Sequence, residues 1–243
     1  MPAEAGRHRL GLRFWPTLLT LVGLVVLIGL GTWQLQRLAW KEGLIARVQA
    51  QLAQPALSLA PGADLAGLDF RRVAVRGAYR HEAAFAFGLT ASGNEPGAHL
   101  ITPFVLEDGS TILIDRGWLP ESLLPPRVPA GLQPGGTVEL EGIARYRGNP
   151  DRTWLTPADQ PDRRRWFGWD VPAMAQATGL PLLPLAVVLD RSEGPAGLPK
   201  VTAVRPEFRN DHLGYALTWY GLAVALLVVY VLYSFTRHEK PLP

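Results

Sequence analysis

The 243-residue sequence contains no cysteine. This excludes disulfide bonds, thiolate metal sites, cysteine nucleophiles and covalent haem attachment through a C-x-x-C-H motif. The motifs of common enzyme classes are missing as well: there is no G-x-S-x-G, no P-loop, no H-E-x-x-H and no dinucleotide-binding glycine pattern. Five histidines are present, and no two of them have the spacing of zinc ligands. We therefore predict a protein that is not an enzyme.

Charge is absent from two long apolar runs, one near each end of the chain. The first run, 14–36, has 23 uncharged residues, and the second, 213–236, has 24. Each exceeds the roughly 20 residues that an α-helix needs to cross a bilayer. We predict transmembrane helices over 14–36 and 212–236. The first is longer than the apolar core of a signal peptide and no small-x-small cleavage site follows it closely, so it is predicted to be a retained anchor.

The net charge of +3 comes from the two ends of the chain. Residues 34–211 hold 19 Lys and Arg against 19 Asp and Glu, whereas the ends hold five basic and two acidic residues. Because basic flanks favour the cytoplasmic side of a membrane, we predict cytoplasmic tails at 1–13 and 237–243. The segment between the two spans is then predicted to lie on the opposite side.

The region between the predicted spans changes character at Pro55. An apolar helical spacing up to this proline predicts a helical stalk over 37–54. Short alternating runs with frequent glycine and proline then predict a mostly antiparallel β domain over 55–211, with one short helix at 171–178. The predicted strands are 71–79, 83–89, 100–106, 111–118, 137–146 and 185–190, and Asp108-Gly109 forms the turn of one hairpin. The fold class is therefore predicted to be an α+β membrane protein, in which an N- and C-terminal pair of transmembrane helices flanks a mostly antiparallel β extramembrane domain with minor helix.

Two polar patterns in the predicted β domain could indicate catalysis or nucleic-acid binding. Glu139 and Glu141 alternate along a predicted strand and so share a face, which could suit acid–base catalysis, but we predict that they form a solvated sheet face. Three arginines lie beside aromatic residues within 162–170, as in a nucleic-acid stacking platform. Acidic residues bracket this cluster and the predicted topology separates it from the cytoplasm, so no nucleic-acid partner is predicted.

The candidate cofactor site is the start of the second span. His212 stands directly before that span, near the membrane depth of Trp33 on the first one. Helical spacing places His212, Tyr215, Trp219 and Leu222 along one stripe, which suits a flat apolar ligand. Because an imidazole nitrogen is a good axial ligand for haem iron, His212 is the candidate metal ligand.

Two arginines near the same interface, Arg37 and Arg209, are candidates to pair with haem propionates. The alternative is that His212 merely reaches the interface or caps the helix. The preceding Asn210-Asp211 supports this alternative, since Asn and Asp commonly cap a helix start. The residues alone leave both interpretations open.

Two motifs beside the predicted spans, GTWQLQRLAWK at 31–41 and NDHLGYALTWYGLA at 210–223, resemble the paired signatures of the Surfeit-locus-one family of cytochrome c oxidase assembly factors. Two further motifs lie between them in the family's order, VRGAY at 75–79 and ILIDRGWLP at 112–120. The resemblance covers nearly the whole chain, from about residue 14 to residue 236.

The resemblance implies a function in the maturation of subunit I of haem-copper oxidases, with transient binding of haem a. His212 matches the family histidine that is proposed as a haem ligand. The implied partners are subunit I and other oxidase assembly factors or haem a synthase. Two positions depart from the family pattern, Asp115 where Asn is usual and Tyr220 where Phe is common.

Two other functions stay as alternatives. The protein is either a cofactor-free scaffold that binds an oxidase assembly intermediate, or, less favoured, a membrane-tethered periplasmic enzyme that uses Glu139 and Glu141. The short, acid-poor N-terminus lacks room for a mitochondrial presequence and a matrix arm. We therefore expect a multi-pass protein of a bacterial inner membrane, with a periplasmic β domain.

Overall fold

The computed structural model describes residues 14–60, 62–149, 152–201 and 211–234. The chain divides into two compact units, one formed by residues 1–46 with 207–243 and the other by residues 47–206. The first unit contains two long helices and the second is a β domain with little helix. This arrangement confirms the predicted fold class, a two-span membrane protein with a β-rich domain between its spans.

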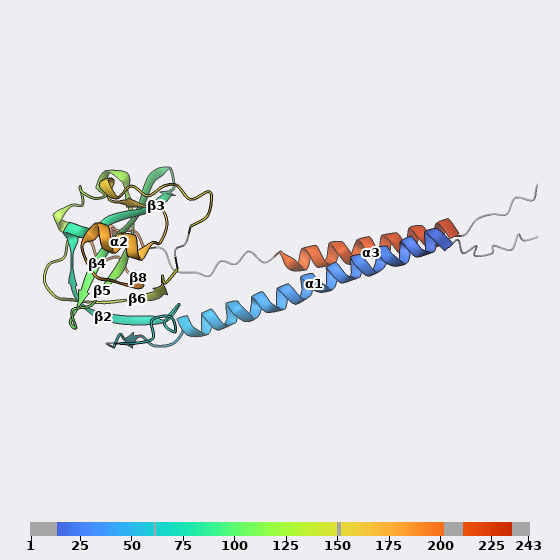
Figure 1. Ribbon diagram of the computed structural model, residues 1–243, viewed down its shortest axis with the longest axis horizontal. Coiled ribbons are helices and arrows are strands. Elements are labelled where there is room, and N and C mark those ends of the chain that lie inside the picture. Colours follow the sequence, from blue (N-terminus) through green and yellow to red (C-terminus); the bar gives the residue numbers. More distant parts are fainter. Residues whose placement is uncertain (1–13, 61, 150–151, 202–210, 235–243) are drawn as a thin grey trace, which may run out of the picture. The chain divides into compact units, whose positions relative to one another are not determined.

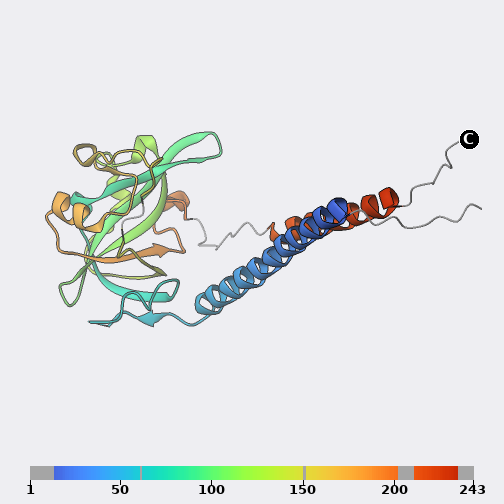
Figure 2. The ribbon, with the colours of Figure 1, turned by 45° about the vertical axis from the view of Figure 1, so that its right-hand side comes forward.

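The two long helices are α1 (Phe14–Leu52) and α3 (His212–Ser234), and both are long and apolar enough to cross a membrane. Figure 1 and Figure 2 show them side by side. They run antiparallel, because Thr17 near the start of α1 contacts Tyr230 near the end of α3, while Gln34 contacts the first residue of α3. α1 is one uninterrupted helix, so the part predicted as a stalk continues the membrane-spanning part without a break.

The contact between the helices follows a repeat of alternating three- and four-residue steps. Such a repeat averages 3.5 residues and is typical of left-handed helix packing. The half-buried or buried positions that follow this repeat form the seam between the helices; they are Thr17, Thr20, Leu24, Leu27, Gly31 and Gln34 on α1 and His212, Ala216, Trp219, Ala223, Leu226 and Tyr230 on α3. Small residues in this seam let the backbones approach closely, as is usual between membrane helices.

Polar contacts cross the seam at three levels. The hydroxyls of Thr17 and Tyr230 lie 2.6 Å apart, and those of Thr32 and Tyr220 lie 3.1 Å apart. At the level of His212, its Nδ1 lies 2.7 Å from Oε1 of Gln34. In lipid each such interhelical hydrogen bond contributes on average only about 0.6 kcal/mol. Their main effect is therefore to fix which residues face each other.

Within the described residues, the β domain has eight strands. Five of them, β2, β6, β8, β5 and β4, pair in that order, and a further pairing of β2 with β4 closes them into a barrel. β3 continues the sheet beyond β4, with β7 at that edge and β1 at the other. The bounds are β1 (Leu57–Ser58), β2 (Arg72–Tyr79), β3 (Phe85–Ser92), β4 (Glu95–Leu106), β5 (Thr111–Pro120), β6 (Val138–Tyr146), β7 (Arg165–Trp166) and β8 (Leu182–Leu189).

Apolar residues fill the barrel and cover its outside. The interior cluster includes Val73, Phe104, Ile112 and Val187, all fully buried. A second cluster lies under the short helix α2 (Val171–Thr178), whose Met174 packs with residues of β4, β5 and β8. The Asp170 carboxylate caps α2 by accepting a hydrogen bond from the N–H of Ala173. All ten residues of β5 are buried, so this strand is the centre of the domain.

A buried charge cluster lies inside the barrel at Arg116. The Arg116 side chain is completely buried, its Nε donates to Oε2 of Glu193 at 2.9 Å, and its guanidinium carbon lies 4.7 Å from the centre of the Tyr79 ring. The Tyr79 hydroxyl donates to the same Glu193 oxygen at 2.8 Å. Burial raises the pKa of Tyr79 far above its ordinary value, and the Glu193 charge raises it further, so the hydroxyl stays protonated.

The R-G-W motif that contains Arg116 therefore has a structural role. Gly117 has φ of +108°, and a Cβ there would lie 2.5 Å from the carbonyl oxygen of Lys200. Trp118 is buried, and its indole N–H donates to the carbonyl of Thr90. Glycine is required at the middle position because only glycine combines this backbone conformation with so close an approach.

We predict that Glu193→Leu lowers the free energy of unfolding by about 3 kcal/mol, because it leaves the Arg116 charge buried without its carboxylate. The double variant Arg116→Met, Glu193→Leu should be more stable than this single variant, since it buries no unpaired charge. Unfolding by denaturant, followed by tryptophan fluorescence, measures both. Glu139→Gln, on the exposed face of β6, is the control. A single variant as stable as the control would contradict the assigned role of the pair.

We also predict that Gly31→Val separates the two helices, whereas Gly29→Val does not. A Cβ at Gly31 would lie 2.8 Å from the Tyr220 ring, while a Cβ at Gly29 would meet no atom within 4 Å. A short bismaleimide crosslinker between cysteines introduced at Thr17 and Tyr230 measures the approach in a bilayer, since the chain has no other cysteine. Equal crosslinking in both valine variants would show that the seam is not as described.

Candidate functional site

The first turn of α3 and the facing part of α1 form the candidate site. His212 is half-buried at the start of α3, and its Nδ1 lies 2.7 Å from Oε1 of Gln34 on α1. Both residues lie in the seam, so helix packing positions each side chain before any ligand is present. The contact explains why the imidazole is held in one orientation.

This hydrogen bond determines the proton arrangement of the imidazole. The carboxamide oxygen of Gln34 can only accept, so Nδ1 of His212 is the donor and carries the proton. In a neutral imidazole the other nitrogen, Nε2, then has its lone pair available. A histidine whose second nitrogen donates to a fixed acceptor is the usual arrangement of a metal-ligating histidine.

The other predicted site residues on α3 and α1 do not all lie in the seam with His212. Trp219 is half-buried in the same seam, two turns along α3. Tyr215 and Leu222 are exposed on α3, and Trp33 is exposed on α1. In a bilayer these three side chains lie on the lipid-facing surface of the pair. Of the predicted stripe on α3, His212 and Trp219 therefore lie in the seam, whereas Tyr215 and Leu222 face the lipid.

Arg37 is held by aromatic residues of its own helix. Its guanidinium carbon lies 5.7 Å from the ring centre of Trp33 and 5.2 Å from that of Trp40. Among the described residues Arg37 forms no ion pair, so its N–H groups are available to an anion while the rings contact its face. Arg37 is three residues from Gln34, which places it on the adjacent turn of α1. Arg209 lies outside the described residues.

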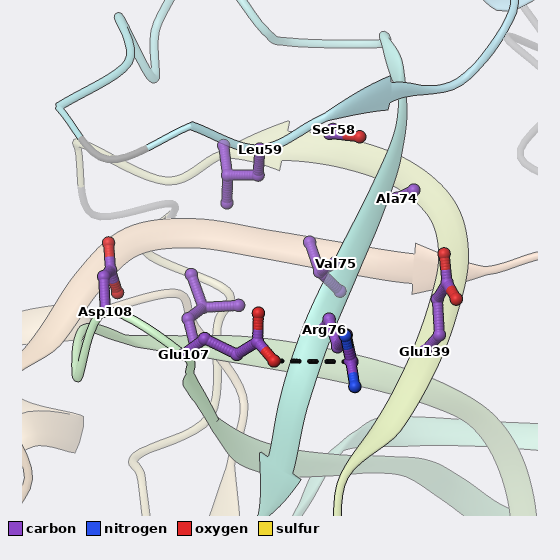
Figure 3. Close-up of a pocket in the computed structure, with 9 residues that line it drawn as sticks. Ser58, Leu59, Ala74, Val75, Arg76, Glu107, Asp108 and Glu139 are labelled. Carbon is purple, nitrogen blue, oxygen red and sulfur yellow. Dashed lines mark ion pairs between the residues drawn. The ribbon is translucent and has the colours of Figure 1, made fainter.

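A surface cavity of the β domain has a different character from this site. It encloses about 490 Å³ where β1, β2, the β4–β5 hairpin and β6 meet. Nε of Arg76 lies 3.4 Å from Oε1 of Glu107, and Figure 3 shows the two side chains facing each other. Its lining residues include no histidine and no aromatic residue. Glu139 lines this cavity, and Glu139 and Glu141 are both solvent-exposed on β6. The prediction that these two share a solvated face is confirmed.

A second histidine has an acidic partner. Nδ1 of His99 lies 2.9 Å from Oδ1 of Asp115, which also accepts the N–H of Gly117 at 3.0 Å. The hydrogen bond to Asp115 raises the pKa of His99, although partial burial opposes this. Asp115, one of the two departures from the family pattern, thus has a hydrogen-bonding role. No cluster of three or more metal-ligating side chains occurs within the described residues.

The sequence analysis missed Gln34 and Trp40. A signal for Gln34 was present: it continues the alternating three- and four-residue steps that pass through Gly31 on α1, as His212 does through Ala216 on α3. Recognising this repeat on both helices would have placed Gln34 in the seam. It would not have given the register that brings Gln34 opposite His212, because that depends on the packing of the two helices.

Comparisons with known proteins agree with the motifs. The sequence model described as the SURF1 family matches residues 21–224. A SURF1-like protein from Monosiga brevicollis is 37% identical over 220 residues, which cover 85% of this chain and 83% of the relative. Surfeit locus protein 1 from Mus musculus is 37% identical over 215 residues, 81% of this chain and 68% of the relative. The human protein of that name is 34% identical over 218 residues, 83% of this chain and 71% of the relative.

The matched region contains most of α1, the whole β domain and the first half of α3, including Gln34 and His212. The chain therefore belongs to the SURF1 family.

Proposed function

We propose that this protein is a non-enzymatic assembly factor for a haem-copper cytochrome c oxidase, and that it holds haem a transiently through Nε2 of His212. The observation that carries the proposal is the hydrogen bond between His212 and Gln34. It holds the imidazole in the tautomer that leaves Nε2 unprotonated, which is the form that binds iron. A histidine that only capped its helix would not need this partner on the other helix.

The surroundings of His212 suit an apolar, flat cargo with acidic groups at its edge. Tyr215 and Leu222 offer aromatic and aliphatic surface on the lipid-facing side of α3. The seam itself is closed by Gly31 against Tyr220 and by buried Ala216. Haem is therefore proposed to lie on the outside of the helix pair, where lipid covers its other face. Arg37 is the proposed partner of a propionate.

Transient holding is consistent with a single ligand. Among the described residues no second histidine or methionine accompanies His212 on the helix pair. A site with two protein ligands would have to break two iron bonds at transfer, whereas this one breaks one. The proposed acceptor is subunit I, and the β domain is the proposed contact with the immature oxidase or with other assembly factors.

The proposed location is a bacterial inner membrane, with both termini in the cytoplasm and the β domain in the periplasm. The excess of basic residues in the two ends of the chain supports this orientation. His212 and Gln34 then lie near the periplasmic surface.

We predict that His212→Ala abolishes haem retention. The full-length protein is purified from cells that make haem a, and its visible spectrum is compared with that of the variant. His81→Ala is the matched control, because His81 bonds the carbonyl of Pro134 within the β domain. Equal haem content in the wild type and His212→Ala would overturn the assignment of the ligand. Haem-free wild-type protein that still restores oxidase assembly would instead establish the cofactor-free scaffold.

Gln34→Leu should lower haem affinity about tenfold, because loss of an outer hydrogen-bond partner of a ligating histidine typically costs 10–100-fold. Gln34→Glu keeps an acceptor for Nδ1 and should retain haem. Gln36→Leu is the control, since Gln36 is exposed on the same helix two residues away. Titration of the purified variants with haem measures the affinities. Equal affinities for Gln34→Leu and Gln36→Leu would show that Gln34 does not position His212.

A further inference from the structure

The loop between β6 and β7 presents two large apolar side chains to solvent. Trp154 is 90% exposed and Leu155 is 69% exposed. Water contact with this much adjacent apolar surface is unfavourable. Outside the long helices, Trp154 has the most exposed side chain among the large hydrophobic residues that the structure describes. Together with the neighbouring Leu155 it makes this loop tip a candidate contact surface.

The loop is held in this arrangement by hydrogen bonds on both sides of the tip. The N–H of Thr153 donates to Oγ1 of Thr156 at 2.8 Å, and the N–H of Thr156 donates to the carbonyl of Thr153 at 3.1 Å. Arg152 pairs with Asp159 beneath the tip. The Asp159 carboxylate also accepts the N–H of Phe167 at 2.7 Å, which fastens the loop to the domain. The domain therefore builds a turn whose apolar side chains point outward.

Exposed arginines flank the same loop system. Two hydrogen bonds between the backbones of Gln160 and Arg165 close a turn directly after Asp159, and Arg163 and Arg164 are exposed within it. Asp162 is the one exposed acid of that turn. The arginine cluster rejected above as a nucleic-acid platform thus belongs to the same loop as the exposed Trp154-Leu155 tip. A loop that exposes both apolar and cationic side chains matches the surface of an anionic bilayer.

We propose that the 152–164 loop is a membrane contact of the β domain. Trp154 and Leu155 enter the interfacial layer of the outer leaflet, where tryptophan is enriched, and Arg163 and Arg164 lie at the level of the lipid phosphates. The occupant is an anionic phospholipid surface. This inference rests on the two-span architecture and is independent of the proposed haem site.

The chain connections keep the domain within reach of the bilayer. β1 begins five residues after the end of α1, and residues 202–210 join the domain to α3. The part of α1 beyond Arg37, residues 38–52, is about 22 Å long at 1.5 Å per residue. A 160-residue domain has a radius of gyration of about 15 Å. A surface loop of such a domain can therefore reach the membrane that anchors both of its ends.

The test uses Leu155→Cys, which gives a unique labelling site because the natural chain has no cysteine. The full-length variant carries an environment-sensitive NBD label and is placed, one protein per nanodisc, in phosphatidylcholine with a minority of phosphatidylglycerol. We expect blue-shifted emission that is quenched when a share of the lipids carries doxyl groups near the headgroup. Leu89→Cys is the matched control, because Leu89 is also 69% exposed but lies on β3. Its emission should stay red and unquenched.

Two further variants, made in the Leu155→Cys protein, separate the apolar contribution of Trp154 from the charge contribution of the two arginines. Trp154→Ala should reduce the quenching by removing the principal anchor. Arg163→Gln, Arg164→Gln should reduce it in discs with phosphatidylglycerol and leave it unchanged in pure phosphatidylcholine. Emission at position 155 that is unquenched in doxyl discs, or equal quenching at positions 155 and 89, would overturn the proposal. The first result would assign the tip to a protein partner instead.

Discussion

The antiparallel packing of α1 against α3 is the interaction on which the candidate site depends. In a bilayer there is no hydrophobic force between helices, so association relies on close packing and on a few polar contacts. Gly31 supplies the close approach, since a side chain there would collide with Tyr220. The hydrogen bonds at Thr17, Thr32 and Gln34 then select one register among those that the apolar surfaces allow. That register places the carboxamide of Gln34 opposite His212.

In the β domain, a buried charge has a comparable role in determining the structure. Arg116 lies inside the closed barrel, where the Glu193 carboxylate and the Tyr79 ring partly compensate for its loss of water. Its Nη1 and Nη2 have no hydrogen-bond partner in the part of the chain that the structure describes. Such a group is costly unless the surrounding structure is well determined, so the loop that carries Glu193 is tied to the barrel. The R-G-W motif is thereby a feature of domain stability, which separates it from the membrane-flanking motifs that form the candidate site.

The sequence predicted the helices and strands of the fold better than the closure of the strands into a barrel. Apolar length gave both spans, and alternation gave six strands, but β4 begins at Glu95, five residues before the predicted start. Gly97 lies inside this strand, and glycine is needed there because a Cβ would be 2.1 Å from the carbonyl oxygen of Leu119. β8 was likewise predicted to start after Pro184 and in fact includes it. The pairing of β2 with β4 joins segments far apart in the chain, and no local pattern encodes it.

The candidate site also depends on a contact between distant segments that local sequence patterns do not predict. His212 was identifiable because it is a lone histidine at the edge of an apolar run, a property of one segment. Gln34 was not, because its significance comes from a contact across 178 residues of chain. A glutamine near a membrane surface is chemically unremarkable by itself. It becomes informative only as the acceptor that fixes the tautomer of a specific imidazole, since this decides which nitrogen is left to bind a metal. For a site formed between two helices, the second partner follows from their register, and the register is set by the small residues and hydroxyls elsewhere in the seam.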